Sequence, residues 1–559
     1  MLVRLFQCAS LTALATCAAV AAQAADLPTR KAPPILAVSG VTWDGFYVGV
    51  QRGYAVSTTK WRAPTGYYQL DYNAHGYNDG LLGGIRAGYN KQVGAMVLGV
   101  EADANAAMMK GYANCGAHPV MGGMGGGTGD VCGNRTEWIG SLTGRLGYAA
   151  GRTLFFVKAG GAFQRERSEI SNLVLNPYLF NDPAFVSKKT SDRFGWTIGA
   201  GMAYALDAHW SATAEYGYYS FGGHTVAFPV PAVPATGTYR VSQAQHIAKF
   251  GLDYRFGGAG GDVAGPAISN DVTGEFGSRI GYSTGRFQKR LYDAFTPSQL
   301  NSVLTWPGQS GLASESFARF DHVSGVFLKG TFGGVSIGKH HMNDEDTAFA
   351  MFPDPYSNTR SATNNGRSVY GTADLGYTFL RRGGMDLGAF VGYGHYTQRV
   401  NAYGCTQVAA GGTVCVPAGS VNPSALTLSE TEHWNALRLG LVGSVMLTER
   451  LKLSGEAAWL AHAKMNAKDN HWLRPDINPL SEKGDSSKGY QLEAVLSYAV
   501  TDRWSVGAGA RYLSLKADGG VQFPYPIPRS PEKFESSRLT GFLQASYRFG
   551  DPAAVVAKY

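Results

Sequence analysis

The sequence predicts an all-β chain built from two transmembrane antiparallel up-and-down β-barrels in tandem, the first of eight strands and the second of ten. Three observations predict this fold. Side chains alternate between large apolar and small or polar groups along many segments. Short and long connections between these segments also alternate along the chain. The same four residues, Tyr-Arg-Phe-Gly, also close both halves of the chain. Alternation joined by connections of two lengths is typical of barrels in a lipid bilayer.

The composition agrees with strands and not with helices as the membrane-crossing elements. Only 16% of the 559 residues are charged, while 12% are aromatic and 74 are Gly. Beyond the N-terminus there is no run of about 18 apolar residues, which excludes transmembrane helices. Lipid otherwise tolerates only closed barrels, because every backbone polar group must be paired there. The net charge of +8 comes without long basic runs, so we expect a surface facing anionic head groups and no nucleic-acid partner.

Residues 1–24 have the features of a signal peptide. Arg4 supplies a short positive region, residues 11–20 are apolar, and Ala22-Gln23-Ala24 is a small-x-small cleavage site. We therefore expect the mature chain to begin at Ala25. A secreted barrel chain is expected to be inserted into the bacterial outer membrane by the barrel-assembly machinery.

The strand prediction depends on which residues share a face. In residues 436–447, Leu437 and Leu439 lie on one face while Arg438 and Gly440 lie on the other, and the segments from 491 and from 539 alternate in the same way. Apolar groups outside and small or polar groups inside are the reverse of a water-soluble barrel. The short turns that alternate with long Gly-, Pro- and Asn-rich loops are centred on Gly94, Gly151, Ala208, Glu449 and Asp502.

Counting strands gives eight between Trp43 and Phe256 and ten between Thr273 and Phe549. The predicted organisation is a first barrel at 25–257, a Gly-rich flexible linker at 258–270 on the periplasmic side, a second barrel at 271–550 and a tail at 551–559. A single eighteen-stranded porin is the alternative. The repeated strand ending and the Gly-rich linker favour two barrels.

Four cysteines remain after the predicted leader, in two local pairs. Cys115 with Cys132, and Cys405 with Cys415, lie in polar, Gly-rich segments that we interpret as loops. Short separation favours the local pairing, although four cysteines allow three connectivities. Disulfides fit a periplasmic folding route. A zinc site is the alternative, although neither pair has the spacing of a zinc finger.

The first half resembles the small eight-stranded surface proteins of alphaproteobacteria. The resemblance covers residues 25–257 and is carried by residues 26–34, by Trp43-Asp44-Gly45-Phe46-Tyr47-Val48-Gly49 and by the closing Tyr254-Arg255-Phe256. It implies a small barrel filled by side chains, with a structural or binding role and no enzymatic site.

The second half carries one chemically suggestive pattern. Asp344 and Asp346 follow the third strand of the second set, and Asp469 and His471 follow the seventh, both on what we expect to be outer loops. In a ring of ten strands these two positions lie nearly opposite each other. Asp469 can fix the tautomer of the His471 ring and raise its basicity, so that His471 takes a proton from a water. Two close carboxylates do not ionise together easily, so one of the first pair can keep a proton.

These motifs and the count of ten strands resemble the omptin family of outer-membrane endopeptidases. The resemblance runs over residues 271–550, and it implies that Asp344 and Asp346 form one catalytic pair and Asp469 and His471 the other. It also implies peptide substrates at the cell surface. Lys289 stands where the family has a Glu that selects basic substrate residues, so cleavage between paired basic residues does not follow.

Other departures and alternatives bear on the same site. Ala467 replaces a second acid of the family, and His395 and Thr397 replace an acid and an Arg of its lipopolysaccharide-binding pattern. No cofactor is expected, with lipopolysaccharide as the only candidate activator. A metal site using His340, His341, Asp344, Asp346 and His471 is one alternative. A catalytically silent structural, adhesive or porin-like barrel is the other.

Overall fold

The structure is a computed structural model that describes residues 42–62, 73–117, 129–172, 185–228, 237–256, 272–347, 357–410, 412, 415–416, 421–472, 478–524 and 528–550. The predicted leader at 1–24, linker at 258–270 and tail at 551–559 lie outside these residues. Within the described ranges, no helix has the length and apolarity needed to cross a bilayer.

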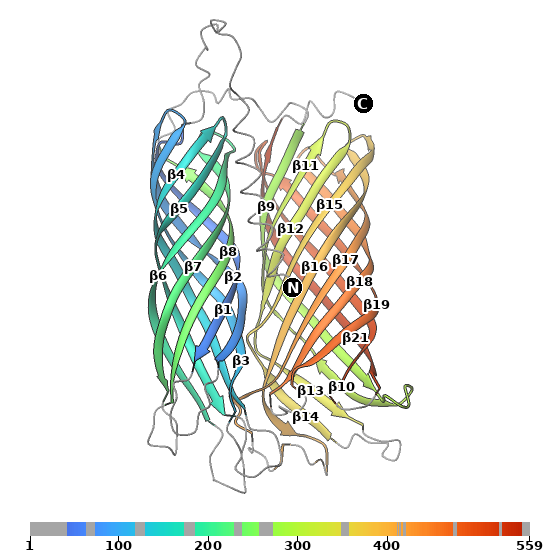
Figure 1. Ribbon diagram of the computed structural model, residues 1–559. Helices are drawn as coiled ribbons and strands as arrows, with labels where there is room; N and C mark the ends of the chain where they lie inside the picture. Colours follow the sequence, from blue (N-terminus) through green and yellow to red (C-terminus); the bar gives the residue numbers. More distant parts are fainter. Residues whose placement is uncertain are drawn as a thin grey trace, which may run out of the picture.

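The first barrel is a closed ring in which each strand pairs antiparallel with its neighbours in sequence, and β1 pairs with β8 (Figure 1). Its eight strands agree with the predicted number. They are β1 (Gly45–Arg62), β2 (Asn73–Val93), β3 (Met96–Ala117), β4 (Gly129–Ala150), β5 (Thr153–Asn172), β6 (Phe185–Ala205), β7 (Trp210–Phe228) and β8 (Gly237–Arg255).

The second barrel contains thirteen strand segments that make ten strands, because three strands are interrupted. The uninterrupted ones are β9 (Val272–Tyr292), β16 (Met385–Gln407), β17 (Leu426–Met446), β18 (Leu451–His471), β19 (Leu480–Ala499), β20 (Trp504–Val521) and β21 (Ser530–Phe549). The interrupted ones are β10 (Leu300–Trp306) with β11 (Gly311–His322), β12 (Val326–Ile337) with β13 (His340–Asp346), and β14 (Ser357–Thr363) with β15 (Gly366–Arg382).

The interruptions lie at residues that do not continue a regular strand. Pro307 and Gly308 separate β10 from β11, and Asn365, between β14 and β15, has a φ of 56°. At the outer side of these breaks, β10, β13 and β14 bridge β9 and β16, while β11, β12 and β15 do the same nearer the short turns. The pairing of β16 with β17 completes the ring.

Two separate rings exclude the single eighteen-stranded porin. The strand β8 returns to β1, and β21 returns to β9, so no hydrogen-bonded ladder runs from one barrel into the other among the described strands. The predicted fold class, eight strands and then ten in tandem barrels, is confirmed.

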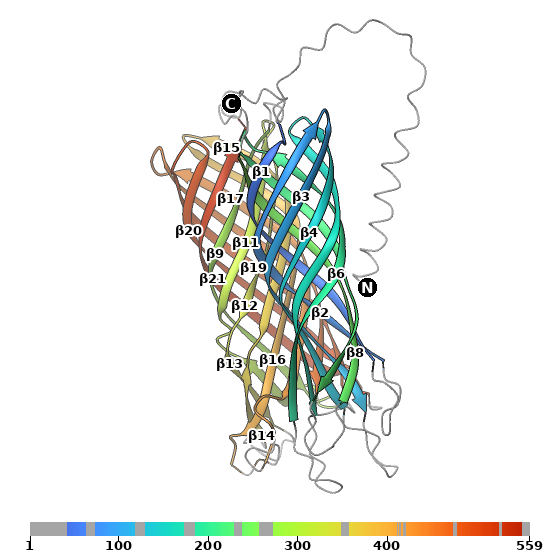
Figure 2. The same cartoon turned by 90° about the vertical axis from the view of Figure 1, so that its left-hand side faces the viewer.

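The two ends of the barrels differ in the length of their connections. We call the end with the short turns, such as 94–95, 151–152 and 501–503, the turn end. We call the opposite end, which carries β13 and β14 at the bottom of Figure 1, the outer end. The barrels lie side by side with their axes roughly aligned, as the two perpendicular views show (Figure 2).

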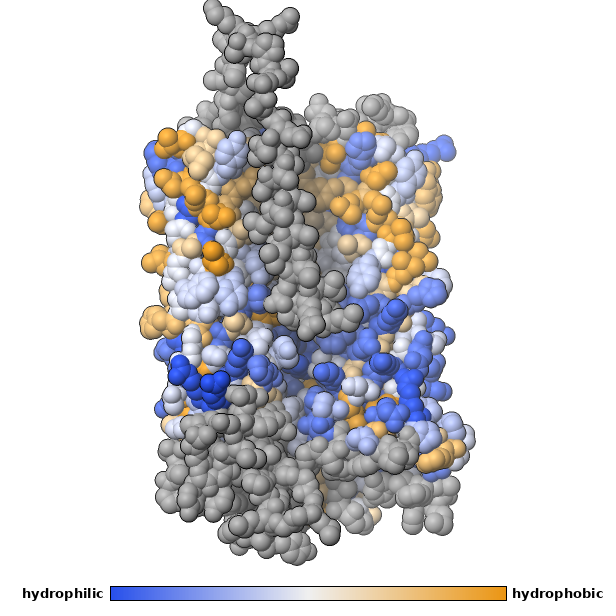
Figure 3. Space-filling view, viewed as in Figure 1, coloured by the Kyte–Doolittle hydropathy of each residue, from blue (hydrophilic) through white to orange (hydrophobic). Residues whose placement is uncertain are grey.

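An apolar belt surrounds the half of the barrels nearer the turn end. Large apolar side chains such as Phe194, Ile280 and Leu543 point outward there, with Phe194 82% exposed. Figure 3 shows apolar residues gathered over the upper part of both barrels and polar residues over the lower part. Exposed apolar groups at this density match a lipid environment and not water. On β17 the outward face changes from Leu437 to Asn435 and His433, so the strands continue beyond the belt toward the outer end.

The lumen of the first barrel is filled with paired charges. Arg86 Nε lies 2.6 Å from Asp253 Oδ1, and Lys158 Nζ lies 2.7 Å from Glu101 Oε1. Lys249 Nζ is likewise 2.7 Å from Glu215 Oε1. Buried charges need such partners, because an unpaired charge away from water is costly. The predicted side-chain-filled interior is therefore observed.

The lumen of the second barrel is layered. At the turn end it holds a cavity of about 1200 Å³ lined by polar and charged side chains. Among the residues that line it, Arg279 and Arg511 bind Glu315, and Arg438 binds Asp374 and Glu456. Toward the outer end comes an apolar layer contributed by strands around the ring, which includes Phe287, Trp306, Trp434 and Phe534. This layer separates the cavity from the polar groups at the outer end.

Candidate functional site

The predicted site residues lie on strands, not on loops. Asp344 and Asp346 belong to β13, the outer continuation of the third strand, and Asp469 and His471 end β18, the seventh strand. The expectation that they follow the strands was therefore wrong. It failed because these segments are polar enough to be taken for loops, although the ladder continues through them: Asp344 pairs with Leu304 and Thr359.

Asp469 and His471 form a hydrogen-bonded pair inside the outer end of the barrel. His471 Nε2 donates to Asp469 Oδ2 at 2.8 Å. Burial alone would lower the pKa of His471, but the adjacent Asp469 carboxylate outweighs it and holds that pKa above its usual value. Burial likewise opposes ionisation of Asp469, yet the charges on His471 and Lys289 keep its pKa well below the ordinary range. The pair is therefore an ionised carboxylate with a basic imidazole.

Asp344 has the opposite character. Burial and the neighbouring Asp346 carboxylate raise the pKa of Asp344 to about 7. The same carboxyl is stabilised in its charged form by His471, so the two predicted pairs interact electrostatically across the lumen. Ser302 Oγ donates a long hydrogen bond of 3.4 Å to Asp344 Oδ1. The Asp344 carboxyl, which is half protonated near neutral pH, thus faces the His471 imidazole, which can accept a proton.

Lys289 is the residue whose role the sequence did not reveal. Its ammonium group is buried on β9 and binds three carboxylates, Glu430 at 2.9 Å, Glu482 at 2.6 Å, and Asp469. Burial would lower its pKa, but these carboxylates hold the pKa well above the ordinary value. Burial and mutual repulsion in turn raise the pKa values of Glu430 and Glu482. The alternation of β17 could have shown that Glu430 points inward, but not which cation it meets.

The same carboxylates have the spacing of a metal site. One oxygen each from Glu430, Asp469 and Glu482 lies within 4.8 Å of the others. Since Lys289 already supplies a positive charge to all three, we assign no metal to this cluster. His340 of the earlier metal hypothesis instead accepts a hydrogen bond from the backbone N–H of Ser310 at 3.1 Å.

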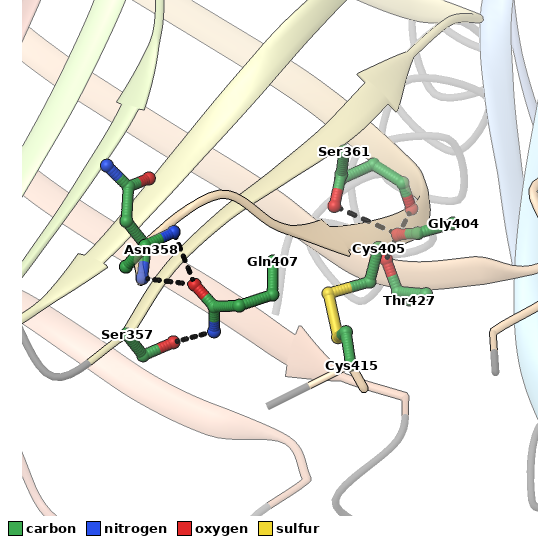
Figure 4. The surroundings of a disulfide bond; sticks show 10 residues. Ser357, Asn358, Ser361, Gly404, Cys405, Gln407, Cys415 and Thr427 are labelled. Carbon is green, nitrogen blue, oxygen red and sulfur yellow. Dashed lines mark hydrogen bonds between the residues drawn. A yellow bond between two sulfur atoms is a disulfide. The ribbon is translucent and has the colours of Figure 1, made fainter. Parts of the chain in front are cut away.

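One predicted disulfide is present close to the outer end. Cys405 and Cys415 are joined, with their Cα atoms 5.8 Å apart. Figure 4 shows that the neighbouring Gly404 carbonyl accepts hydrogen bonds from the hydroxyls of Ser361 at 2.9 Å and Thr427 at 3.0 Å. Cys405 lies near the end of β16, so the prediction that it lies in a loop was wrong.

The other predicted pair is described only in part. Cys132 lies buried in β4 and is disulfide-bonded. The side chain of Cys115 lies outside the described residues, although its backbone belongs to β3. Both residues are on strands, so the expectation of a loop was wrong here as well.

Two closed barrels with outward apolar belts and charged interiors define an integral β-barrel protein of the bacterial outer membrane. The family model of the outer membrane protein β-barrel domain matches residues 10–256. The 31 kDa outer-membrane immunogenic protein of Brucella melitensis is 30% identical over 258 residues, which are 44% of this chain and 98% of that protein. The 22 kDa outer membrane protein of Rhizobium leguminosarum is 27% identical over 177 residues, 32% of this chain and 64% of that protein.

The chain belongs to this family of outer-membrane β-barrel proteins, and the residues that the family model matches contain the first barrel. The predicted resemblance to alphaproteobacterial surface proteins and the predicted location in the outer membrane are thereby confirmed. Among solved structures, the outer membrane protease OmpT from Escherichia coli has 14% sequence identity and a TM-score of 0.42, and the match covers 50% of this chain and 98% of that one.

Proposed function

We propose that the outer end of the second barrel is a hydrolytic site for peptides at the cell surface. The observation that carries this proposal is the hydrogen bond between His471 and the ionised Asp469, facing an Asp344 whose pKa is about 7. His471 would take a proton from a water molecule, while protonated Asp344 would donate a hydrogen bond to the peptide carbonyl and stabilise the developing oxyanion. Water is the nucleophile, and no covalent intermediate forms.

The position of the site suits an extracellular substrate. It lies beyond the apolar belt, and the apolar layer around Trp306 and Trp434 separates it from the cavity at the turn end. A substrate would therefore approach from the cell exterior. Lys289 occupies the centre of the acidic cluster, so a strong preference for basic side chains is not expected.

A direct test uses the refolded full-length chain and a library of quenched fluorescent peptides, with and without lipopolysaccharide. His471→Ala should lower the cleavage rate by about 10²- to 10⁴-fold, the usual contribution of a general base. Heat-modifiable gel migration would show that the barrels remain folded. His433→Ala is the matched control, because His433 is exposed on the outward face of β17. Equal rates in all three proteins would contradict the proposal.

A catalytically silent surface barrel is the second candidate. The observation that favours it is Lys289, which binds the Asp469 carboxylate together with His471 and balances its charge without any substrate. In that case no peptide in the library is cut by the wild-type chain under any condition. The same assay therefore distinguishes the two candidates.

A further inference from the structure

The two barrels contact each other next to the candidate site. Trp472 directly follows His471 and packs in one apolar cluster with Ala425 and Leu426 of its own barrel. The first barrel contributes three residues to the same cluster: Tyr112 from β3, Val131 from β4 and Val186 from β6. The first barrel thus reaches the residue next to His471.

Tyr112 is the centre of this contact. Its ring centroid lies 6.3 Å from that of Trp472, and its hydroxyl is 2.5 Å from the hydroxyl of Tyr403 on β16. Its neighbour Ala113 belongs to an apolar cluster in the lumen of the first barrel, so the alternation of β3 directs Tyr112 outward. The Tyr112 side chain therefore serves the contact between barrels and not the filling of its own.

Trp472 is fixed on its other sides by the second barrel. Its backbone N–H donates to the Thr427 carbonyl at 3.0 Å, and its indole N–H donates to Ser429 Oγ at 3.0 Å. With the Tyr112 ring on the remaining side, the end of β18 is held from both barrels. Because Trp472 directly follows His471, a displacement of the Trp472 backbone would also displace the backbone that carries the imidazole.

A second contact at the outer end fixes the relative rotation of the barrels. Arg367 Nε on β15 lies 3.0 Å from Asp79 Oδ2 on β2, and Arg399 NH1 on β16 lies 3.7 Å from Asp79 Oδ1. The backbone carbonyl of Lys110 accepts hydrogen bonds from both guanidinium groups. Two separate contacts on the same side leave little room for one barrel to turn against the other.

We propose that the first barrel is a positioning part of the site in the second barrel: the Tyr112, Val131 and Val186 side chains hold Trp472, and through it they hold His471 in hydrogen-bonding distance of Asp469. This inference rests on the proposed function for its consequence in catalysis. A displacement of about 1 Å in a reacting group can reduce a rate about 10²-fold, so a contact outside the site can have a large effect. The first barrel would then contribute to catalysis in the second barrel, in addition to its place in the membrane.

The test compares three variants of the full-length chain. Tyr112→Ala removes the ring, whereas Tyr112→Phe keeps the ring and removes only the hydroxyl. Trp210→Ala removes another aromatic contact between the barrels, its ring centroid 5.6 Å from that of Trp504, but at the turn end far from the site. The proposal predicts a loss of about 10-fold to 10²-fold in kcat for Tyr112→Ala, near-complete rescue by Tyr112→Phe and no loss for Trp210→Ala.

The second readout is the titration of His471 in nitrogen-15-histidine spectra of the same proteins, with the resonance assigned from His471→Gln. The charged groups that act on His471 are Asp469 on its own strand, Lys289 on β9 and Asp344 on β13, while Glu430 on β17 and Glu482 on β19 bind Lys289. The wild-type midpoint should lie above about 6.5. In Tyr112→Ala it should fall toward that value, because the bond to Asp469 loosens, and it should stay unchanged in Trp210→Ala.

The two readouts separate the two proposals. If no protein cleaves peptides but Tyr112→Ala still moves the His471 midpoint, the proposed function fails and the positioning role stands. If the wild type cleaves peptides and Tyr112→Ala changes neither kcat nor the midpoint, the positioning role is overturned. If Trp210→Ala has the same effects as Tyr112→Ala, the contact is a general stabiliser and the proposal is likewise overturned.

Discussion

Lys289 and His471 bind the same oxygen atom, Oδ2 of Asp469. One carboxylate thus links the acidic cluster around Lys289 to the imidazole of the candidate site. The two partners differ in accessibility, since the side chain of Lys289 is 3% exposed and that of His471 is 26% exposed. The buried lysine fixes the charge of Asp469, and the more accessible histidine is left to exchange protons.

The first prediction concerns Lys289→Met. This change leaves Glu430, Glu482 and Asp469 facing one another without a cation, and losing one partner of a buried ion pair typically costs about 3–5 kcal/mol. We expect the urea midpoint of the refolded chain to fall at pH 7. The loss should be smaller at pH 5, where the crowded carboxylates take up protons.

Lys516→Met is the control for this change. Its ammonium group lies 3.3 Å from Glu535, but its side chain is 56% exposed, so water replaces the interaction at little cost. Equal midpoints for Lys289→Met and the wild type would show that the cluster does not depend on this lysine.

The second prediction is a narrow bell-shaped dependence of peptide cleavage on pH. Activity should rise as His471 loses its proton, with a midpoint above about 6.5, and fall as Asp344 loses its proton near pH 7. Asp469→Asn removes the charge that raises the His471 pKa, so the rising limb should move to lower pH. Asp346→Asn removes the like charge beside Asp344, so the falling limb should also move to lower pH.

Both limbs are obtained by measuring the peptide-cleavage rate of the full-length chain between pH 5 and 9. Because the two groups interact, the midpoints belong to the pair and not to each residue alone. His433→Ala should leave the profile unchanged. A profile that keeps its shape in Asp346→Asn would rule out Asp344 as the acid.

Much of the fold was predictable because one periodicity runs through the whole chain. Leu437 and Leu439 point outward and Arg438 inward, as the alternation indicates, and β8 and β21 end within the repeated motif, at Arg255 and Phe549. For the candidate site, the sequence indicated which residues take part but not that they lie on strands. Asp344 continues the inward face of its strand, but its polar surroundings suggested a loop.

The partners of these residues were not predictable, because they come from distant strands. Lys289 meets Glu430 and Glu482, which lie on β17 and β19, and no local pattern relates the three positions. The contact of Tyr112 with Trp472 joins two barrels whose relative rotation the sequence does not specify. The alternation of side chains predicts whether a residue points inward or outward. Its partners across the lumen depend on how the barrel closes, which the alternation does not show.

The third prediction concerns Asp79→Asn. Asp79 accepts hydrogen bonds from Arg367 and Tyr54 and forms an ion pair with Arg399, so its neutralisation leaves two guanidinium groups without their shared counter-charge. We expect the contact between the barrels to weaken by about 1–3 kcal/mol. The barrels should then unfold in urea as two transitions, where the wild type unfolds as one.

Asp192→Asn provides the comparison, because Asp192 forms an exposed pair with Arg165 and contacts only its own barrel. Tryptophan fluorescence and gel migration would follow unfolding of the whole chain. Two transitions already present in the wild type would show that this contact does not couple the barrels.

The fourth prediction is that the second barrel does not conduct ions as a porin does. Phe287, Trp306, Trp434 and Phe534 come from four strands around the ring and form one buried apolar cluster, so the lumen between the cavity and the outer end is filled. Small barrels of this kind are packed by side chains. The full-length chain in a planar bilayer should give no stepwise conductance. Trp306→Ala combined with Trp434→Ala removes the two largest side chains of the layer and should allow small, irregular currents. Large uniform steps in the wild type would mean that the layer opens, and the separation of the outer site from the cavity would then fail with it.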